Sequence, residues 1–214
     1  VVLSSINEII PKSYETIIEQ KRLEGKFLIG YAGSFSQANN IHSLIEAAQI
    51  LNNSEFEIYF FLLGQGPLKE IIEQKIKDSK LKNITLLNAL PKSQVLNFLI
   101  RMDALYIGFK KQSIYRFGIS PNKIFDYMMA GKPIIQAIDA GNNLVKEANC
   151  GIYVEPENID ELISAILKLK SLTPEQRTTL GNNGKEYVIK NHSYDILANN
   201  YLESISSIIN GNKS

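Results

Sequence analysis

The sequence has one cysteine, Cys150, two histidines and no tryptophan among its 214 residues. A lone cysteine excludes an intrachain disulfide and a cysteine-based metal site, and it favours a reducing compartment. The histidines, His42 and His192, are too far apart in sequence for the usual spacing of zinc ligands. We expect them to be surface or half-buried helix residues, and we expect Cys150 to be a small buried side chain.

The chain also lacks an excess of either charge. It carries 23 basic and 22 acidic residues, for a net charge of +1. Such a balance provides no global field that would attract nucleic acid, so a polyanion must be bound by a local cluster of cations. No apolar run approaches the ~20 residues of a membrane-spanning helix. We expect no secretory signal at the start of the chain.

Apolar runs alternate with stretches of helical periodicity through most of the sequence. Strands are expected at residues 26–32, 56–64, 83–87, 103–109, 132–137 and 151–154. Helices are expected at residues 40–51, from 66 onward, and at 92–102, 121–131, 142–148, 158–171, 173–190 and 193–209. Helices between successive strands predict a mostly parallel sheet covered on both faces. The fold class is therefore α/β, a doubly wound sheet of Rossmann-like topology.

Residues 26–210 are expected to form this single domain. Residues 1–25 precede the first strand, and we interpret them as a helix or linker from an upstream domain. The chain begins at Val1 rather than at an initiator methionine. We therefore expect the domain to have been excised from a longer protein.

Open α/β sheets bind ligands beyond the carboxyl ends of their strands, where the strand order reverses. Segments 33–40 and 109–121 should both face that crevice. The second segment holds cations, and it ends in a Ser-Pro pair that suits the start of a helix, with Ser120 as cap and Pro121 in the first helical position. The cations of this region are Lys110, Lys111, Arg116 and Lys123. Cations beside free helix N–H groups suit a phosphate or diphosphate. The alternative is that these charges only solvate an exposed loop.

Lys123 and Asp126 are three residues apart and share one face of the expected helix. They form either a surface ion pair or a functional pair, in which the lysine meets phosphate and the carboxylate reaches the ribose. Gly64 and Gly66 follow the second expected strand, as in a dinucleotide-binding motif, but Lys69 stands where that motif needs its third glycine. We therefore interpret residues 64–67 as a structural turn. That broken pattern disfavours an NAD-dependent dehydrogenase.

The stretch "GISPNKIFDYMMAGKPII" at residues 118–135 resembles the donor-site helix of the family 4 retaining glycosyltransferases, especially bacterial members that build capsule and O-antigen sugars. The resemblance covers residues 26–205. Other segments that agree in order and spacing are "IGYAGSF", "SLIEAAQIL", "FFLLGQGPLKEII", "NITLLNALPKSQVLNFLIRMDALYIG" and "ANCGIYVEPENIDELISAIL".

The resemblance implies one half of a GT-B fold, the C-terminal domain that holds a nucleotide-diphosphate sugar, expected to be UDP-linked. A glycan or lipid-linked acceptor would bind through the missing N-terminal domain, so this fragment alone should be inactive. Transfer would proceed with retention, through electrostatic stabilisation of the leaving diphosphate, without a cofactor or metal. The resemblance also implies a cytoplasmic location, with peripheral association at the inner face of the membrane open to the full-length protein.

Site residues are carried over position by position. The donor-binding residues implied are Gly33, Ser34, Leu90, Arg116, Ser120, Asn122, Lys123 and Asp126. Asp126 matches the second acidic residue of the family's motif, which contacts the ribose, whereas the first matches Gly118. An Arg and a Lys that often follow the first strand are replaced by the neutral Ser34 and Asn39.

Two other functions stay open. A sugar-nucleotide epimerase of related fold would also need a second domain. A nucleotide-binding or protein-interaction module without chemistry is favoured by the neutral residues at positions 34, 39 and 118. Donor hydrolysis or transfer by the full-length protein would separate this module from a transferase.

Overall fold

The computed structural model describes residues 9–211. Its six strands form one sheet in the order β3-β2-β1-β4-β5-β6, and every neighbouring pair is parallel. The strands are β1 (Phe27–Ala32), β2 (Ile58–Gly64), β3 (Ile84–Asn88), β4 (Ala104–Gly108), β5 (Ile134–Ala137) and β6 (Gly151–Tyr153). This order confirms the predicted doubly wound α/β fold, with its reversal between β1 and β4.

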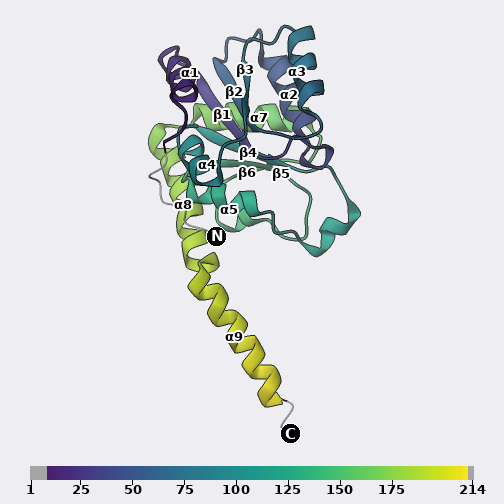
Figure 1. Ribbon diagram of the computed structural model, residues 1–214, viewed down its shortest axis with the longest axis vertical. Coiled ribbons are helices and arrows are strands. Elements are labelled where there is room, and N and C mark those ends of the chain that lie inside the picture. Colours follow the sequence, from purple (N-terminus) through teal and green to yellow (C-terminus); the bar gives the residue numbers. More distant parts are fainter. Residues whose placement is uncertain (1–8, 212–214) are drawn as a thin grey trace.

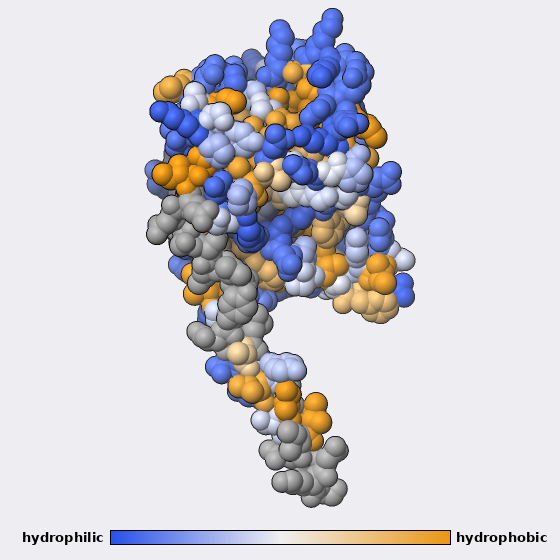
Figure 2. All heavy atoms as spheres, viewed as in Figure 1, coloured by the Kyte–Doolittle hydropathy of each residue, from blue (hydrophilic) through white to orange (hydrophobic). Residues whose placement is uncertain are grey.

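Helices connect the strands and continue after the last one (Figure 1). They are α1 (Lys12–Leu23), α2 (Ile41–Leu51), α3 (Lys69–Asp78), α4 (Lys92–Leu99), α5 (Asn122–Met129), α6 (Leu144–Glu147), α7 (Ile159–Ser171), α8 (Pro174–His192) and α9 (Tyr194–Gly211), with short 3₁₀ turns η1 (Gln37–Asn39) and η2 (Ser113–Phe117). Figure 1 shows α9 extending away from the body of the domain. Figure 2 shows hydrophobic side chains exposed along it. The exposed residues of α9 include Leu202 and Ile208.

The sheet separates two hydrophobic cores. Successive strand residues alternate between them, as Leu28 and Ile29 of β1 show, because side chains of a strand point to opposite faces. Helices α1, α4, α5 and α8 contribute to the first core, and α2, α3 and α7 contribute to the second. Every residue of β1 and β2 is buried, as expected of central strands in a parallel sheet.

Helix α1 packs on the first core. Ile18 is buried beside residues of β1, and two ion pairs tie the helix to the turn before β4: Arg101 with Glu15 (2.6 Å) and Arg22 with Asp103 (3.3 Å). Residues 1–8 lie outside the described part of the chain. The assignment of residues 1–25 to an upstream domain stays a prediction.

Helices α3 and α5 begin later than predicted. Helix α3 begins at Lys69 because the preceding turn is bound elsewhere, with the Leu68 N–H donating to the Phe35 carbonyl (3.0 Å). Pro121 is the cap of α5 rather than its first residue, since its extended ψ of 121° is not helical, and Ser120 therefore lies outside the helix. Helix α4 begins at Lys92, as predicted, with Pro91 as its cap.

Candidate functional site

A cavity of about 560 Å³ opens at the carboxyl ends of the central strands, beside the first turns of α4 and α5. Six of the predicted donor-binding residues line it: Gly33, Ser34, Leu90, Asn122, Lys123 and Asp126. Arg116 and Ser120 are not among its lining residues, and both are exposed. Segments that are distant in sequence therefore meet where the strand order reverses, as the topology requires.

Glycines allow the backbone around this cavity to close up. A Cβ at Gly64 would lie 1.9 Å from the Gly33 carbonyl oxygen, so only glycine permits the ends of β1 and β2 to approach this closely. A Cβ at Gly33 would lie 3.0 Å from Nζ of Lys123. Gly33 thus makes room for the lysine. The role of Gly64 was not visible in the sequence, because its neighbour Gly33 is distant in the chain.

Lys123 is one of two lysines that line this cavity, with Lys92. Its Nζ donates to Asn39 Oδ1 (2.6 Å) and lies 3.4 Å from the Tyr31 hydroxyl. It also lies over the rings of Tyr31 and Phe109, at 5.1 and 5.4 Å from their centroids. No carboxylate in the described part of the chain pairs with it, and burial lowers the pKa of its ammonium from 10.5 to about 8. A partly buried cation with neutral partners favours an anionic ligand.

Asp126 pairs with Lys92, the first residue of α4, and not with Lys123. The surface pair of Lys123 and Asp126, one of the two sequence interpretations, is therefore not formed. Both members of the Lys92–Asp126 pair line the cavity, and the aspartate is the less exposed of the two. The role of Lys92 was not visible in the sequence, since its partner lies 34 positions away.

The amino terminus of α5 also faces this cavity, because Pro121, Asn122 and Lys123 line it. The cap residue Pro121 has no side chain that could bond the first helical N–H groups, and no such capping bond is formed. Free N–H groups and the positive end of the helix dipole are thus directed toward the same space as the Lys123 ammonium. This combination suits the oxygens of a phosphate or diphosphate.

The other cations of the β4–α5 loop do not join Lys123. Lys111 pairs with Glu155 (2.6 Å) and Asp139 (3.4 Å), and these carboxylates raise its pKa. The Arg116 guanidinium lies 4.5 Å from the centroid of the Phe117 ring. Lys110 lines a separate cavity beside the start of α2. The predicted cluster of four cations is therefore reduced to one at the cavity.

Gly118 adopts a left-handed backbone conformation, with φ of +96°. A Cβ there would be strained, and it would lie 3.3 Å from Oδ1 of Asn142. Asn142 holds this turn through both of its amide atoms: Ile119 N–H donates to its Oδ1 (2.8 Å), and its Nδ2 donates to the Ile119 carbonyl (2.9 Å). The position where the resemblance places an acidic residue is thus a main-chain turn.

The two histidines and the cysteine, to which the sequence analysis gave no role in a binding site, do not line the cavity. His42 is exposed, 3.7 Å from Glu46, and His192 packs against Phe125 and Tyr187. Cys150 is 1% exposed, and burial raises the pKa of its thiol to about 12. Among the described residues, no three His, Cys, Asp or Glu are grouped so as to hold a metal ion, and no helix there is long and apolar enough to cross a membrane.

The model of the family described as glycosyl transferases group 1 matches residues 13–187 of this chain. The chain belongs to this family. An uncharacterized glycosyltransferase of Methanocaldococcus jannaschii is 26% identical over 166 residues, which are 77% of this chain and 44% of that protein. The chain therefore spans less than half the length of this glycosyltransferase relative.

Solved glycosyltransferase structures share the fold. Staphylococcus aureus TarM, solved with fondaparinux, α-GlcNAc-glycerol and UDP, has a TM-score of 0.69 at 17% identity over 83% of this chain and 35% of that one. Anabaena HepE, solved with UDP-glucose, has a TM-score of 0.67 at 18% identity over 94% of this chain and 54% of that one. The C-terminal domain of a group 1 glycosyl transferase, LpcC from Francisella tularensis, has a TM-score of 0.65 at 17% identity over 82% of this chain and 92% of that one. These likenesses show the GT-B type of Rossmann-like domain.

Proposed function

We propose that this chain is the donor-binding domain of a family 4 retaining glycosyltransferase, and that its cavity holds a nucleotide-diphosphate sugar. The observation that carries this proposal is Lys123, a cation that lines the cavity with no carboxylate among the described residues to neutralise it. The family membership supplies the reaction class, since group 1 glycosyl transferases are sugar transferases by name.

The proposed roles follow from the geometry. Lys123 and the N–H groups at the start of α5 would stabilise negative charge on the leaving diphosphate, which is electrostatic catalysis. Asp126 would accept hydrogen bonds from ribose hydroxyls. Leu90 and Val95 line the same cavity and offer an apolar surface for the nucleobase. Neither a metal nor a cofactor takes part in this proposal.

The acceptor and cellular setting belong to the proposal too. We place the acceptor, a glycan or a lipid-linked sugar, on a second domain, as in a capsule or O-antigen transferase at the inner, cytoplasmic face of a membrane. UDP is the expected leaving group, which is supported by the UDP in the TarM structure and the UDP-glucose in the HepE structure. The chain alone should bind donor without transferring sugar.

Calorimetric titration of the chain with UDP and with uridine tests the donor site. We expect UDP to bind more tightly, because only UDP carries the diphosphate that Lys123 would contact. Equal affinities would overturn the diphosphate site. Absence of transfer by the full-length protein, despite tight UDP binding, would instead favour a non-catalytic nucleotide-binding module, the alternative suggested by the neutral Ser34 and Asn39. Interconversion of UDP-sugars would indicate an epimerase.

A further inference from the structure

We propose that Asn39 is a positioning residue that orients the Lys123 ammonium toward the ligand and holds it without neutralising it. This inference rests on the proposed function, since it concerns the same diphosphate. It assigns a role to a residue that does not line the cavity and that carries no charge of its own.

The hydrogen bonds fix the orientation of the Asn39 amide. Its Nδ2 donates to the Ser34 carbonyl (2.9 Å) and to the Ser36 hydroxyl oxygen (2.9 Å). Its Oδ1 must then point the other way, where it accepts from Lys123 Nζ at 2.6 Å. The Tyr31 hydroxyl donates to the same Ser34 carbonyl (2.8 Å). The loop after β1 is thereby bound to the first turn of α5 through one amide group.

The chemistry of an amide explains why this partner leaves the cation available. A carboxylate at position 39 would satisfy Lys123 but would cancel its charge and repel phosphate oxygens. An aliphatic side chain would leave the ammonium without an acceptor on this side. The amide oxygen accepts one of the three N–H bonds of the ammonium and contributes no net charge. The full positive charge of Lys123 then remains for an anion in the cavity.

The titratable surroundings of Lys123 are simple. Burial lowers its pKa to about 8, and burial also raises the pKa of the Tyr31 phenol, which therefore stays neutral over the working range. Asp126, one turn further along α5, is engaged by Lys92 from α4. Phe109, from the loop after β4, presents only its ring. Asn39 is thus the closest group through which the charge of Lys123 can be adjusted.

This arrangement predicts a pH dependence of UDP binding. A diphosphate binds the protonated lysine, so UDP affinity should be constant below the pKa and fall by up to about tenfold per pH unit above it. Uridine should show no such decline. Titrations of UDP and uridine against the chain, at pH values from 6.5 to 9.5, give the midpoint of the decline.

Two substitutions should move that midpoint in opposite directions. Asn39→Asp places a carboxylate against the ammonium, so the midpoint should rise above pH 8, while UDP affinity at pH 7 should fall by about tenfold or more. Asn39→Ala removes an acceptor of the charged form, so the midpoint should fall below pH 8. Asn53→Asp is the matched control: it adds the same charge at an exposed position at the opposite edge of the sheet, and it should change neither midpoint nor affinity.

The outcomes separate this inference from the proposed function. If UDP binds no more tightly than uridine to the unaltered chain at any pH, the proposed function fails. If UDP binding declines near pH 8 in the unaltered chain and both Asn39 variants keep that midpoint, Asn39 does not adjust Lys123, and the inference alone is overturned. Equal losses of UDP and uridine affinity with an unchanged midpoint would mean that Asn39 only holds the loop. Circular dichroism confirms that each variant is folded.

Discussion

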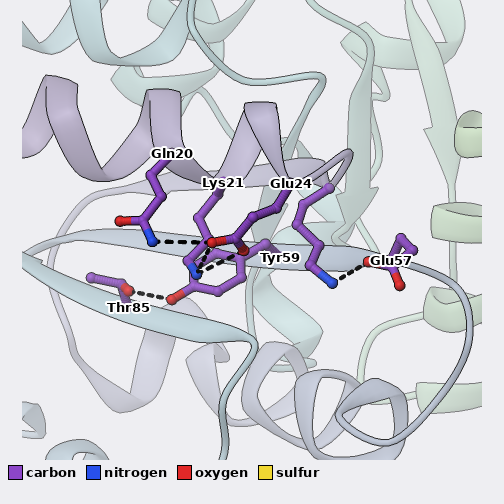
Figure 3. A network of polar contacts seen from close by, with 7 residues as sticks. Gln20, Lys21, Glu24, Glu57, Tyr59 and Thr85 are labelled. Carbon is purple, nitrogen blue, oxygen red and sulfur yellow. Dashed lines mark hydrogen bonds and ion pairs between the residues drawn. The ribbon is translucent and has the colours of Figure 1, made fainter.

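The two edges of the sheet each carry a cavity lined by lysines, and Lys21 and Lys26 at the amino edge are paired differently from Lys123 at the carboxyl edge. At the amino edge, beside a cavity of about 340 Å³, Lys21 pairs with Glu24 at 2.9 Å (Figure 3). Lys26 pairs with Glu57 at the same edge. At the carboxyl edge, Lys123 has only neutral partners. Paired charges at a cavity are satisfied within the fold, whereas an unpaired one remains open to a partner of opposite charge.

The amino-edge network is also tied into the fold by aromatic and hydroxyl groups. Lys21 lies 5.0 Å from the centroid of the Tyr59 ring, and the Tyr59 hydroxyl meets the Thr85 hydroxyl at 2.7 Å (Figure 3). These contacts join α1 to β2 and β3. The same residue type therefore helps to hold elements together at one edge, and at the other it lines a cavity without a carboxylate partner among the described residues.

The largest expected effect is on UDP binding by Lys123→Met. The lost contact is charge-assisted, so UDP affinity should fall by about 1.5–3 kcal/mol while uridine affinity stays the same. Lys26→Met, which removes a paired lysine at the amino edge, is the matched control and should leave UDP affinity unchanged. Calorimetric titration of both variants measures the difference. Similar losses in the two variants would erase the distinction between the edges.

The same substitution should affect stability in a pH-dependent manner. The folded-state pKa of Lys123 is lowered to about 8 from 10.5, so a cost is fully present below about pH 8, where both states hold the proton. Between pH 8 and 10.5 the folded protein releases its proton first, and the cost disappears. Lys123→Met should therefore be more stable than the unaltered chain at pH 7, by on the order of 2 kcal/mol, and this gap should close as the pH rises.

Urea unfolding at pH 7 and pH 10 measures this gap for Lys123→Met and, as reference, for Lys26→Met. The reference should change the free energy of unfolding by about 1 kcal/mol or less, as for other solvent-accessible ion pairs. A Lys123→Met protein that is less stable than the unaltered chain at pH 7 would show that the lysine stabilises the fold.

Asp126→Asn is expected to have the next-largest effect on UDP affinity. If Asp126 accepts ribose hydroxyls, UDP affinity should fall by about 1–2 kcal/mol, because a neutral acceptor replaces a charged one. A 2′,3′-dideoxy nucleotide lacks those hydroxyls and should bind both proteins equally. Titration of both proteins with both ligands completes a double-mutant cycle. Zero coupling would remove Asp126 from the ribose contact and leave it as the partner of Lys92.

The sequence predicts the sheet because apolar strands and periodic helices alternate along it, and parallel order follows from that alternation. It also leads to Lys123, since the residues after the fourth strand must face the crevice. Its partner Asn39 lies 84 positions away, and the carboxylates that pair with Lys111 lie on later loops. Such pairings depend on the folded position of separate elements, so composition and spacing do not predict them.

Lys111 should give the smallest effect and the closest test of the comparison. Lys111 lies at the same carboxyl edge of the sheet as Lys123, and from charge patterning alone it is an equal candidate for binding phosphate. In the structure two carboxylates, Glu155 and Asp139, neutralise it. Lys111→Ala should therefore leave both UDP and uridine affinity unchanged within calorimetric error. A loss of UDP affinity alone would mean that the carboxylates release Lys111 when the nucleotide binds. Pairing in the free protein would then no longer distinguish structural lysines from those that meet the ligand.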